Sequence, residues 1–292
     1  MQVGIVFNRI TWEVKQLISE LEKKSMKYMK INNQEIYYKL SKEKDLDFGH
    51  NCDIILERSL SFLRGLYTGA ILEQKGYRVI NNYECLHLSG NKLLTTLKLI
   101  ENEIPTPLTC VSFKEKPSIE AIEKNINYPA VIKPIIGSWG RLIAKVDDYN
   151  SAISNLECRE TMGNIIQKIY YLQEYIPPSK TESEAPTDYR VFVVGDRCVA
   201  AMGRFHPKNN FRSGIASGGT AKQIDLTPEI EQLSLKAAKA VNGEIVGIDL
   251  MGVEGDYKVI EVNGTPQFRG ISNATNINIA KQIIEYLESK YK

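Results

Sequence analysis

The chain has 292 residues, of which 43% are hydrophobic and 25% charged, with 37 Lys and Arg against 35 Asp and Glu. This composition is typical of a globular protein with a sizeable core and about two domains, and the balanced charge does not favour a dedicated nucleic-acid binder. No apolar run approaches the roughly 20 residues that span a bilayer, and MQVGIVFNRITWEVK reaches charged residues too early for a signal peptide, so we expect a cytoplasmic protein.

The N-terminal part alternates strand and helix signals. Short apolar runs predict strands at Gln2–Phe7, Cys52–Leu56 and Tyr77–Ile80, and helical spacing predicts helices over Trp12–Ser25 and Ser61–Lys75. This alternation indicates a parallel α/β layer. The segment VGIVFNRI stands where a dinucleotide fold would have G-x-G-x-x-G, so the layer lacks that phosphate fingerprint.

The middle of the chain mixes helices and strands. A helix that carries Lys92 ends near Asn102, and a strand (Thr109–Phe113) and a helix (Ser118–Lys124) follow it. The runs PAVIKP and RLIAKV predict two further strands, which the small residues of IIGSWG join through a turn.

The last third consists mostly of paired strands. YRVFVV-GD-RCVAAMGRF predicts a hairpin with Gly195 and Asp196 in its turn, and a helix capped by Thr227 follows. A second hairpin, EIVGIDLMGV-EGD-YKVIEVNG, precedes a C-terminal helix near Asn278–Tyr291. The polar, proline-bearing stretch Pro177–Asp188 predicts a surface loop.

The second hairpin contains the most informative group of residues. If its turn is centred on Gly255, Asp249 and Glu261 lie at equal sequence distances from the turn and face each other. Facing side chains of an antiparallel pair are only about 5 Å apart at Cβ, and two like charges there are unfavourable unless they share a cation or a proton. Asn263 shares their face. These oxygen donors suit Mg²⁺, and the alternative is that one carboxylate points to solvent.

The turn after PAVIKP is a second candidate site. The predicted strand delivers Lys133, and Gly137-Ser138-Trp139-Gly140 follows. Such a turn can direct backbone N–H groups at a phosphate, although it is no Walker A loop. On its own it is more typical of a plain β-turn.

Two weaker features follow in the chain. Gln173-Glu174-Tyr175-Ile176 ends a predicted strand and could offer backbone groups to an adenine edge, or could equally be an edge strand. Arginine suits bidentate anion binding, although an exposed surface position is the usual alternative. Three arginines occur after this segment: Arg190, Arg204 and Arg212.

The combined order of these motifs resembles the ATP-grasp superfamily, and more narrowly the RimK-type ligases of the LysX/ArgX subgroup. The similarity also covers PIIGSWGR, RETMGN, EVNGTP-x-F-R-G and ATNINIA. It implies an α/β (α+β) ATP-grasp fold with three parts: a pre-ATP-grasp domain (1–88), a small lobe (89–172) and a C-terminal lobe with the metal site (173–292).

The resemblance also implies roles for individual residues. ATP phosphates would be bound by Lys92 and Lys133 and covered by Gly137, Ser138, Trp139, Gly140 and Arg141. The nucleotide would otherwise meet Gln173, Glu174, Tyr175, Ile176 and Arg204. Magnesium would be held by Asp249, Glu261 and Asn263. Lys133 and Arg212 would act in catalysis, and Arg190, Arg212, Gly270 and Ile271 would bind substrate.

The implied reaction is ATP-dependent amide formation through an acyl phosphate. The carboxylate would be the C-terminal glutamate side chain of a small acidic LysW-type carrier protein, and the amine would be the α-amino group of an amino acid. The pair Gly270-Ile271 is nearer to the form that goes with glutamate than to the form that goes with α-aminoadipate. Related ligases are commonly dimers or tetramers, so we expect a homo-oligomer without nucleic-acid or membrane partners.

Two departures from the family pattern leave room for a different function. Gly214 stands where the family has an asparagine after Arg212, and the insert Pro177–Asp188 is long for a carrier-protein ligase. The chain could instead be a RimK-like glutamate ligase that acts on a cofactor or a ribosomal protein. It could also be an ATP-grasp kinase or a non-catalytic nucleotide-binding protein.

Overall fold

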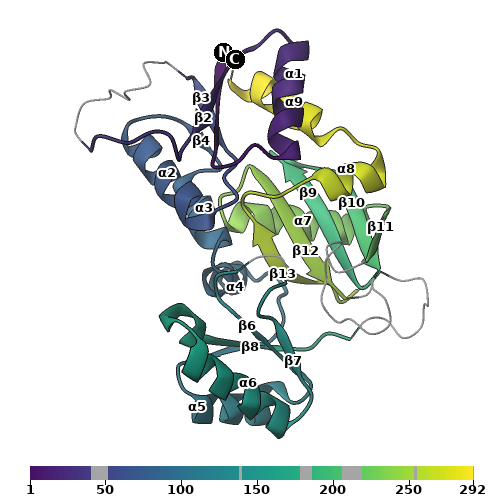
Figure 1. Ribbon diagram of the computed structural model, residues 1–292. Coiled ribbons are helices and arrows are strands. Elements are labelled where there is room, and N and C mark those ends of the chain that lie inside the picture. The colour runs from purple at the N-terminus through teal and green to yellow at the C-terminus, as the bar shows by residue number, and fades with distance from the viewer. Residues whose placement is uncertain (41–51, 138–139, 178–185, 206–218, 253–254, 292) are drawn as a thin grey trace.

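The computed structural model describes residues 1–40, 52–137, 140–177, 186–205, 219–252 and 255–291. These residues form three sheets in three stacked units (Figure 1). The strands are β1 (Gln2–Phe7), β2 (Lys27–Asn32), β3 (Ile54–Glu57), β4 (Val79–Ile80), β5 (Thr109–Ser112), β6 (Ala130–Lys133), β7 (Ala144–Val146), β8 (Tyr170–Glu174), β9 (Asp188–Val194), β10 (Arg197–Phe205), β11 (Thr220–Gln223), β12 (Ile245–Met251) and β13 (Lys258–Asn263). The α-helices are α1 (Trp12–Lys23), α2 (Phe62–Gln74), α3 (Tyr83–Ser89), α4 (Lys92–Glu101), α5 (Glu115–Ala121), α6 (Tyr149–Met162), α7 (Pro228–Ala240), α8 (Arg269–Thr275) and α9 (Ile279–Tyr291).

The N-terminal unit is a parallel sheet, as its alternating pattern predicts. Its strand order is β2-β1-β3-β4, and all three strand pairs are parallel. Strand β2 was not predicted, because it lies at the edge of the sheet and Ile31 is its only buried residue. An edge strand with so few buried residues lacks the apolar run by which a parallel strand is predicted from sequence.

The middle unit is an antiparallel sheet in the order β5-β8-β6-β7. One face packs on α5 and α6 through Ala130, Ile132, Tyr170 and Leu172. The alternate residues Val131, Lys133, Tyr171 and Gln173 therefore share the opposite face. Strand β8 begins only at Tyr170, because Asn164 caps a 3-10 helix over Ile165–Lys168 directly before it.

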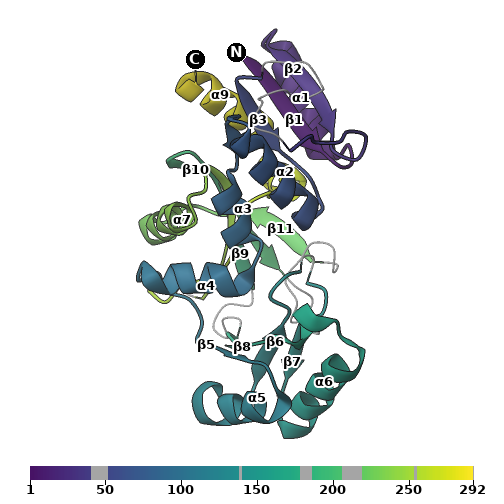
Figure 2. The ribbon, with the colours of Figure 1, turned by 90° about the vertical axis from the view of Figure 1, so that its left-hand side faces the viewer.

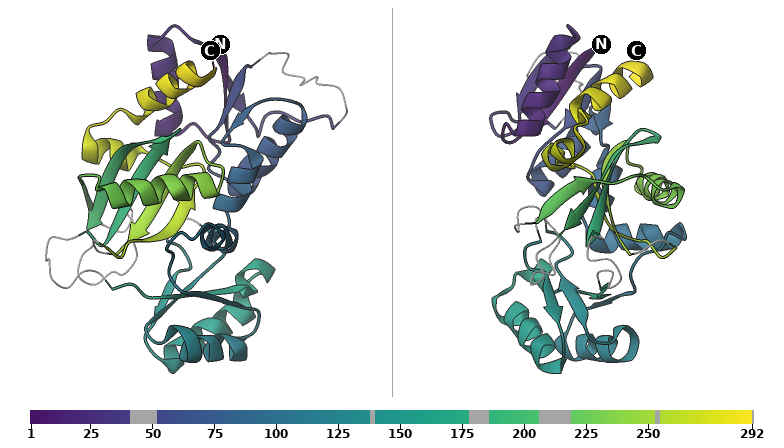
Figure 3. Two further views of the ribbon diagram at one scale, coloured as in Figure 1. Left: turned by 180° about the vertical axis from the view of Figure 1, so that it is seen from behind. Right: turned by 90° about the vertical axis from the view of Figure 1, so that its right-hand side faces the viewer.

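The C-terminal unit is a five-stranded sheet in the order β11-β10-β9-β12-β13. Helix α7 packs on one face through Ile230, Leu233 and Ala237 (Figure 3, left). Part of the other face packs on α8, α9 and the N-terminal unit. The predicted hairpin is confirmed, with Gly195 at φ +63° in its turn, and Thr227 caps α7 as expected.

The two chain ends lie side by side at the N-terminal unit (Figure 1). Helix α9 packs against α1 there, so residues from both ends of the chain share one hydrophobic core. No helix in the described part of the chain is long and apolar enough to cross a membrane.

Asn81, directly after β4, ties the N-terminal unit to the C-terminal sheet. Its buried amide donates to the carbonyls of Ile245 and Gly264, both at 2.6 Å, and accepts from the N–H groups of Glu244 (2.9 Å) and Ile245 (3.0 Å). These bonds hold the start of β12 beside the end of β13. The junction therefore contains specific buried hydrogen bonds in addition to apolar contact, and Arg58 adds another by donating to the Pro266 carbonyl at 2.6 Å.

We expect Asn81→Ala to lower the free energy of unfolding by about 3 kcal/mol, because buried backbone groups lose their partners. The adjacent Asn82→Ala is a matched control. The Asn82 side chain accepts one capping bond, from Cys85 N at 2.7 Å, so its loss should cost only about 1 kcal/mol. Urea denaturation of both variants measures the difference, and equal losses would contradict the role of Asn81.

Candidate active site

The two carboxylates of the second hairpin face each other, as the sequence predicts. Asp249 of β12 is paired with Glu261 of β13, and Gly247 is paired with Asn263. Asn263 therefore lies two residues from Glu261 on the same face. The Asn263 Nδ2 donates to the Gly247 carbonyl at 3.3 Å, which leaves its amide oxygen as the atom available to a cation.

A β-bulge beyond this pair was not predicted. After Asp249 the register shifts, so that Leu250 faces Val259 and Ile260 becomes an extra residue. Val259 and Val262 both enter the hydrophobic core, whereas Ile260 and Glu261 both line the cavity described below. A regular strand would place these two neighbours on opposite faces, and a bulge re-aims them.

Arginines of two neighbouring strands hold Asp249. Arg190 of β9 is its cross-strand partner and binds both carboxylate oxygens, and Arg204 of β10 approaches at 3.2 Å. Arg204 also pairs with Asp188. Burial alone would raise the pKa of Asp249, but the two arginines lower it to about 2. Asp249 is therefore ionised at neutral pH. Arg204 is only 7% exposed, so the alternative of an exposed surface position does not apply to it.

Lys92 reaches the other carboxylate. It is the first residue of α4, a helix that lies between the middle and C-terminal units (Figure 2). Its Nζ donates to Glu261 Oε1 and to the Gly137 carbonyl, both at 2.9 Å. Lys92 thus links the carboxylate pair to the start of the glycine-containing turn.

Lys133, at the end of β6 in the middle unit, lines the same cavity as Lys92, Asp249 and Glu261. Burial is the main reason why its pKa falls to about 8, and the nearby charge of Lys92 acts in the same direction. Glu261 and Asp249 oppose this shift. A partly desolvated ammonium of this kind gains more from a bound anion than an exposed one.

These side chains line one cavity between the middle and C-terminal units. The predicted residues among its lining are Lys92, Lys133, Gln173, Glu174, Tyr175, Ile176, Arg204, Asp249 and Glu261. Six lining residues were not predicted, namely Asp188 and the apolar Val131, Ile143, Leu250, Met251 and Ile260. One sequence signal could have indicated the bulge. In YKVIEVN two apolar residues are adjacent, which interrupts strict alternation and could have placed Ile260 on the cavity face.

The lining combines an apolar part with three cations and four carboxylates. Aliphatic side chains supply the apolar part, and Lys92, Lys133 and Arg204 supply the cations. The opposed carboxylates and the Asn263 amide are oxygen donors, the set that Mg²⁺ prefers. The chemistry of these residues therefore fits a divalent cation, which Asp249, Glu261 and Asn263 would hold.

Several side chains of the predicted adenine segment, residues 173–176, contact other parts of the protein. Glu174 Oε1 accepts from Lys258 Nζ (2.7 Å) and from Leu108 N (3.0 Å), so this carboxylate joins β8 to β13. Lys145 Nζ lies 5.0 Å from the centre of the Tyr175 ring. The hydrogen bonds of the Gln173 side chain are described below.

The other predicted residues are not brought into the cavity lining. Ile271 is 1% exposed and packs in the core with α1 and α9, and Gly270 precedes it in α8. Arg190, Asn263, Gly137, Gly140 and Arg141 are also absent from the described lining, although Arg190 and Gly137 contact residues that belong to it. Ser138, Trp139, Arg212, Gly214 and most of the insert 177–188 lie outside the described residues.

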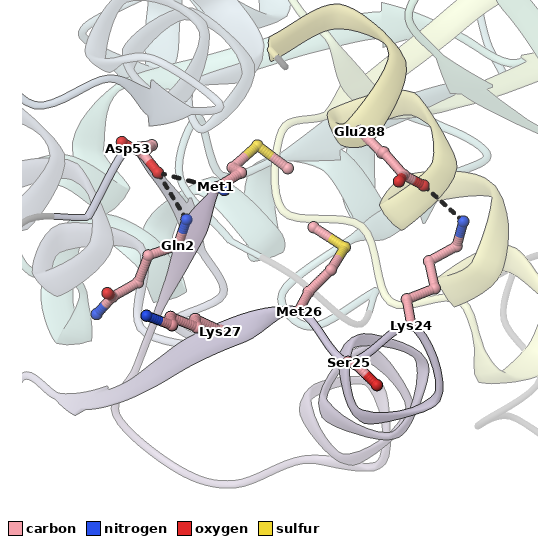
Figure 4. A pocket seen from close by; sticks show the side chains of 8 residues that line it. All are labelled: Met1, Gln2, Lys24, Ser25, Met26, Lys27, Asp53 and Glu288. Carbon is pink, nitrogen blue, oxygen red and sulfur yellow. Dashed lines mark hydrogen bonds and ion pairs between the residues drawn. The ribbon is translucent and has the colours of Figure 1, made fainter.

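A second hollow lies at the N-terminal unit, between the start of β1 and the ends of α1 and α9 (Figure 4). Asp53 accepts from the Gln2 N–H at 2.6 Å and lies 3.9 Å from the N-terminal ammonium, and Lys24 contacts Glu288 at 2.7 Å. None of the residues predicted for nucleotide or metal binding lines this hollow.

Family models match nearly the whole chain. Residues 3–88 match the LysX preATP-grasp domain, and residues 89–287 match the RimK-like ATP-grasp domain.

Curated relatives align over 94% or more of the chain. The glutamate–LysW ligase ArgX of Sulfolobus acidocaldarius is 32% identical, covering 100% of this chain and 99% of that protein. The α-aminoadipate–LysW ligase LysX of Saccharolobus solfataricus is 34% identical, covering 94% and 96%. The tetrahydromethanopterin:α-L-glutamate ligase of Methanocaldococcus jannaschii is 31% identical, covering 99% and 100%.

Solved structures share the fold. A RimK-domain ATP-grasp protein of Sphaerobacter thermophilus superposes with a TM-score of 0.77 at 20% identity, covering 98% of this chain and 99% of that one. The ATP-grasp ligase PsnB, solved with a precursor variant, Mg and ADP, superposes with a TM-score of 0.75 at 17% identity, covering 99% and 98%.

Proposed function

Because this chain belongs to the RimK-like ATP-grasp family and carries a LysX pre-ATP-grasp domain, we propose that it is an ATP-dependent ligase. It joins the α-amino group of glutamate to the C-terminal glutamate side chain of a LysW-type carrier protein. The strongest support is the facing pair Asp249–Glu261, set beside two lysines and an apolar slot in one cavity.

On this proposal ATP lies between the lobes formed by residues 89–172 and 173–292. Its adenine occupies the slot beside Ile143, Met251 and Ile260, and its phosphates extend toward Lys92 and Lys133. Asp249, Glu261 and Asn263 hold Mg²⁺, which neutralises phosphate charge when bound. The ion pairs of Arg190 and Arg204 with Asp249 keep this carboxylate ionised and in place until the cation arrives.

The chemistry proceeds in two displacements. The carrier carboxylate attacks the γ-phosphorus, the bond to the β-bridging oxygen breaks, and an acyl phosphate and ADP result. The amine of the amino acid then attacks the acyl carbon, loses a proton and expels phosphate, leaving an amide. Lys133 stabilises charge on the departing ADP, and Arg212 binds the acyl phosphate. Closure of the lobes excludes water from that intermediate.

The choice of glutamate depends on the pair Gly270-Ile271 near the start of α8. Relatives named for glutamate and for α-aminoadipate are about equally similar to this chain, so overall identity does not separate the two substrates. Ile271 is buried in the core, and its influence on the amino acid would therefore pass through the position of the α8 backbone.

A second candidate is a glutamate ligase that acts on a pterin-type cofactor. The support is the relative of that name, which aligns over 99% of this chain at 31% identity. The same phosphoryl chemistry would serve either carboxylate, so only the acceptor differs.

The proposal is tested by the intact mass of an acidic carrier incubated with this protein, ATP and Mg²⁺. We expect a gain of one glutamate residue with glutamate, a smaller yield with α-aminoadipate, and no gain with the Lys133→Met variant. A gain with α-aminoadipate alone would support the mechanism but identify α-aminoadipate, and not glutamate, as the amino-acid substrate. Transfer of glutamate to a pterin cofactor, with no change in carrier mass, would replace the first candidate by the second.

A further inference from the structure

Lys133 lies at one end of a chain of buried polar side chains. Strand pairing sets Val131 opposite Gln173 and Lys133 opposite Tyr171 in β6 and β8, and Thr109 of β5 opposite Gln173. These side chains share the sheet face that points away from α5 and α6. Lys133 and Gln173 are diagonal neighbours on it, within reach of long side chains.

The hydrogen bonds along this face form a continuous relay. Lys133 Nζ donates to Gln173 Oε1 at 2.5 Å. Gln173 Nε2 donates to Thr109 Oγ1 and to the Tyr171 hydroxyl, both at 3.0 Å. The Tyr171 hydroxyl and Thr96 Oγ1 are 2.7 Å apart, and Thr96 lies one turn beyond Lys92 in α4.

The donors and acceptors permit only one orientation of the Gln173 amide. An ammonium group has donors alone, so the amide oxygen must face Lys133, and both amide hydrogens are then used by the two hydroxyls. Gln173 is 1% exposed, so its side chain has no free donor to offer an adenine edge. The nucleotide contact expected for this segment uses backbone groups, and it stays a prediction.

We propose that Gln173 is a positioning residue, whose amide, oriented by Thr109 and Tyr171, holds the Lys133 ammonium toward the nucleotide phosphates. The inference rests on the proposed function, because it requires Lys133 to bind those phosphates. A lysine has a flexible stem and a compact charge, so a fixed acceptor reduces the conformational freedom lost on binding.

The test is a double-mutant cycle on ATP affinity, measured by isothermal titration calorimetry with ATP and Mg²⁺ and no acceptor. Gln173→Met removes the amide and keeps the length of the side chain. A hydrogen bond to a charged group predicts affinity weaker by about tenfold or more for Gln173→Met, and Lys133→Met should be at least as weak. The double variant should be no more than about twofold weaker than Lys133→Met, because the two residues act together.

The outcomes separate three cases. If the two effects multiply, or if Gln173→Met keeps full affinity, Gln173 does not act through Lys133 and the inference is wrong. If Lys133→Met itself binds ATP normally, the proposed role of Lys133 fails instead. Should Gln173→Met not fold, Gln173→Asn withdraws the acceptor by one methylene and must show the same coupling.

The far end of the relay supplies the control for a purely structural role. Tyr171→Phe and Thr109→Val each leave the bond between Lys133 and Gln173 in place. Each variant keeps one of the two hydroxyls that orient the Gln173 amide, so we expect both to lose thermal stability and to weaken ATP affinity by less than Gln173→Met does. An affinity loss equal to that of Gln173→Met would show that the whole face, rather than the Gln173 acceptor, determines binding.

Discussion

Asp249→Asn should reduce ligase turnover by at least about a thousandfold, or ~4 kcal/mol in the barrier. The substitution removes one of the two facing carboxylates and therefore a charged ligand for Mg²⁺. It also leaves Arg190 and Arg204, whose side chains are 15% and 8% exposed, without the anion that they share. Breaking a buried pair in this way costs about 3–5 kcal/mol of stability, so the thermal midpoint should fall as well.

Asp188→Asn is the matched control for this effect. Asp188 is 1% exposed and pairs with the same arginine, Arg204, but it does not face Glu261. We expect a comparable loss of stability without a change in the Mg²⁺ concentration that half-saturates turnover. Titration of Mg²⁺ against rate in both variants measures this. An Asp249→Asn enzyme that lost stability but kept its turnover and Mg²⁺ dependence would exclude the hairpin as the metal site.

ATP affinity should fall as the pH rises past about 8, where Lys133 loses its proton. Burial lowers the pKa of Lys133 well below the ordinary value for a lysine, so the ammonium form is present below about pH 8 and disappears above it. Phosphates bind the ammonium form and raise its pKa in the complex. The affinity therefore falls by up to about tenfold per pH unit until that higher value is reached. Calorimetry with ATP and Mg²⁺ from about pH 7 to about pH 10 measures this slope.

The control for this prediction is Lys133→Arg. A guanidinium keeps its charge over the whole range, so the variant should bind ATP more weakly than the unmodified protein but without this loss above pH 8. The same slope in Lys133→Arg as in the unmodified protein would assign the titration to another group.

Several features of this protein follow from the sequence alone. Strand and helix periodicity predicts the parallel N-terminal sheet, both C-terminal hairpins and the cap at Thr227. A turn centred on Gly255 predicts that Asp249 faces Glu261, but the pairs nearer the turn, Leu250–Val259 and Met251–Lys258, are one residue out of that register. The bulge at Ile260 restores the predicted register at Asp249 and Glu261, so this pair was predicted correctly although the bulge between it and the turn was not.

Only the tertiary structure decides which cations pair with the carboxylates of Asp249 and Glu261 and which side chains surround them. The cations that approach Asp249 and Glu261 come from β9, β10 and α4, elements whose spatial order depends on sheet topology and on the packing of α4 between two units. The bulge at Ile260 and the orientation of the Gln173 amide also depend on distant parts of the chain. Each is determined by the strands that pair with it and by the residues that those strands bury. Local sequence patterns record burial and turns, whereas these contacts depend on which distant strands become neighbours.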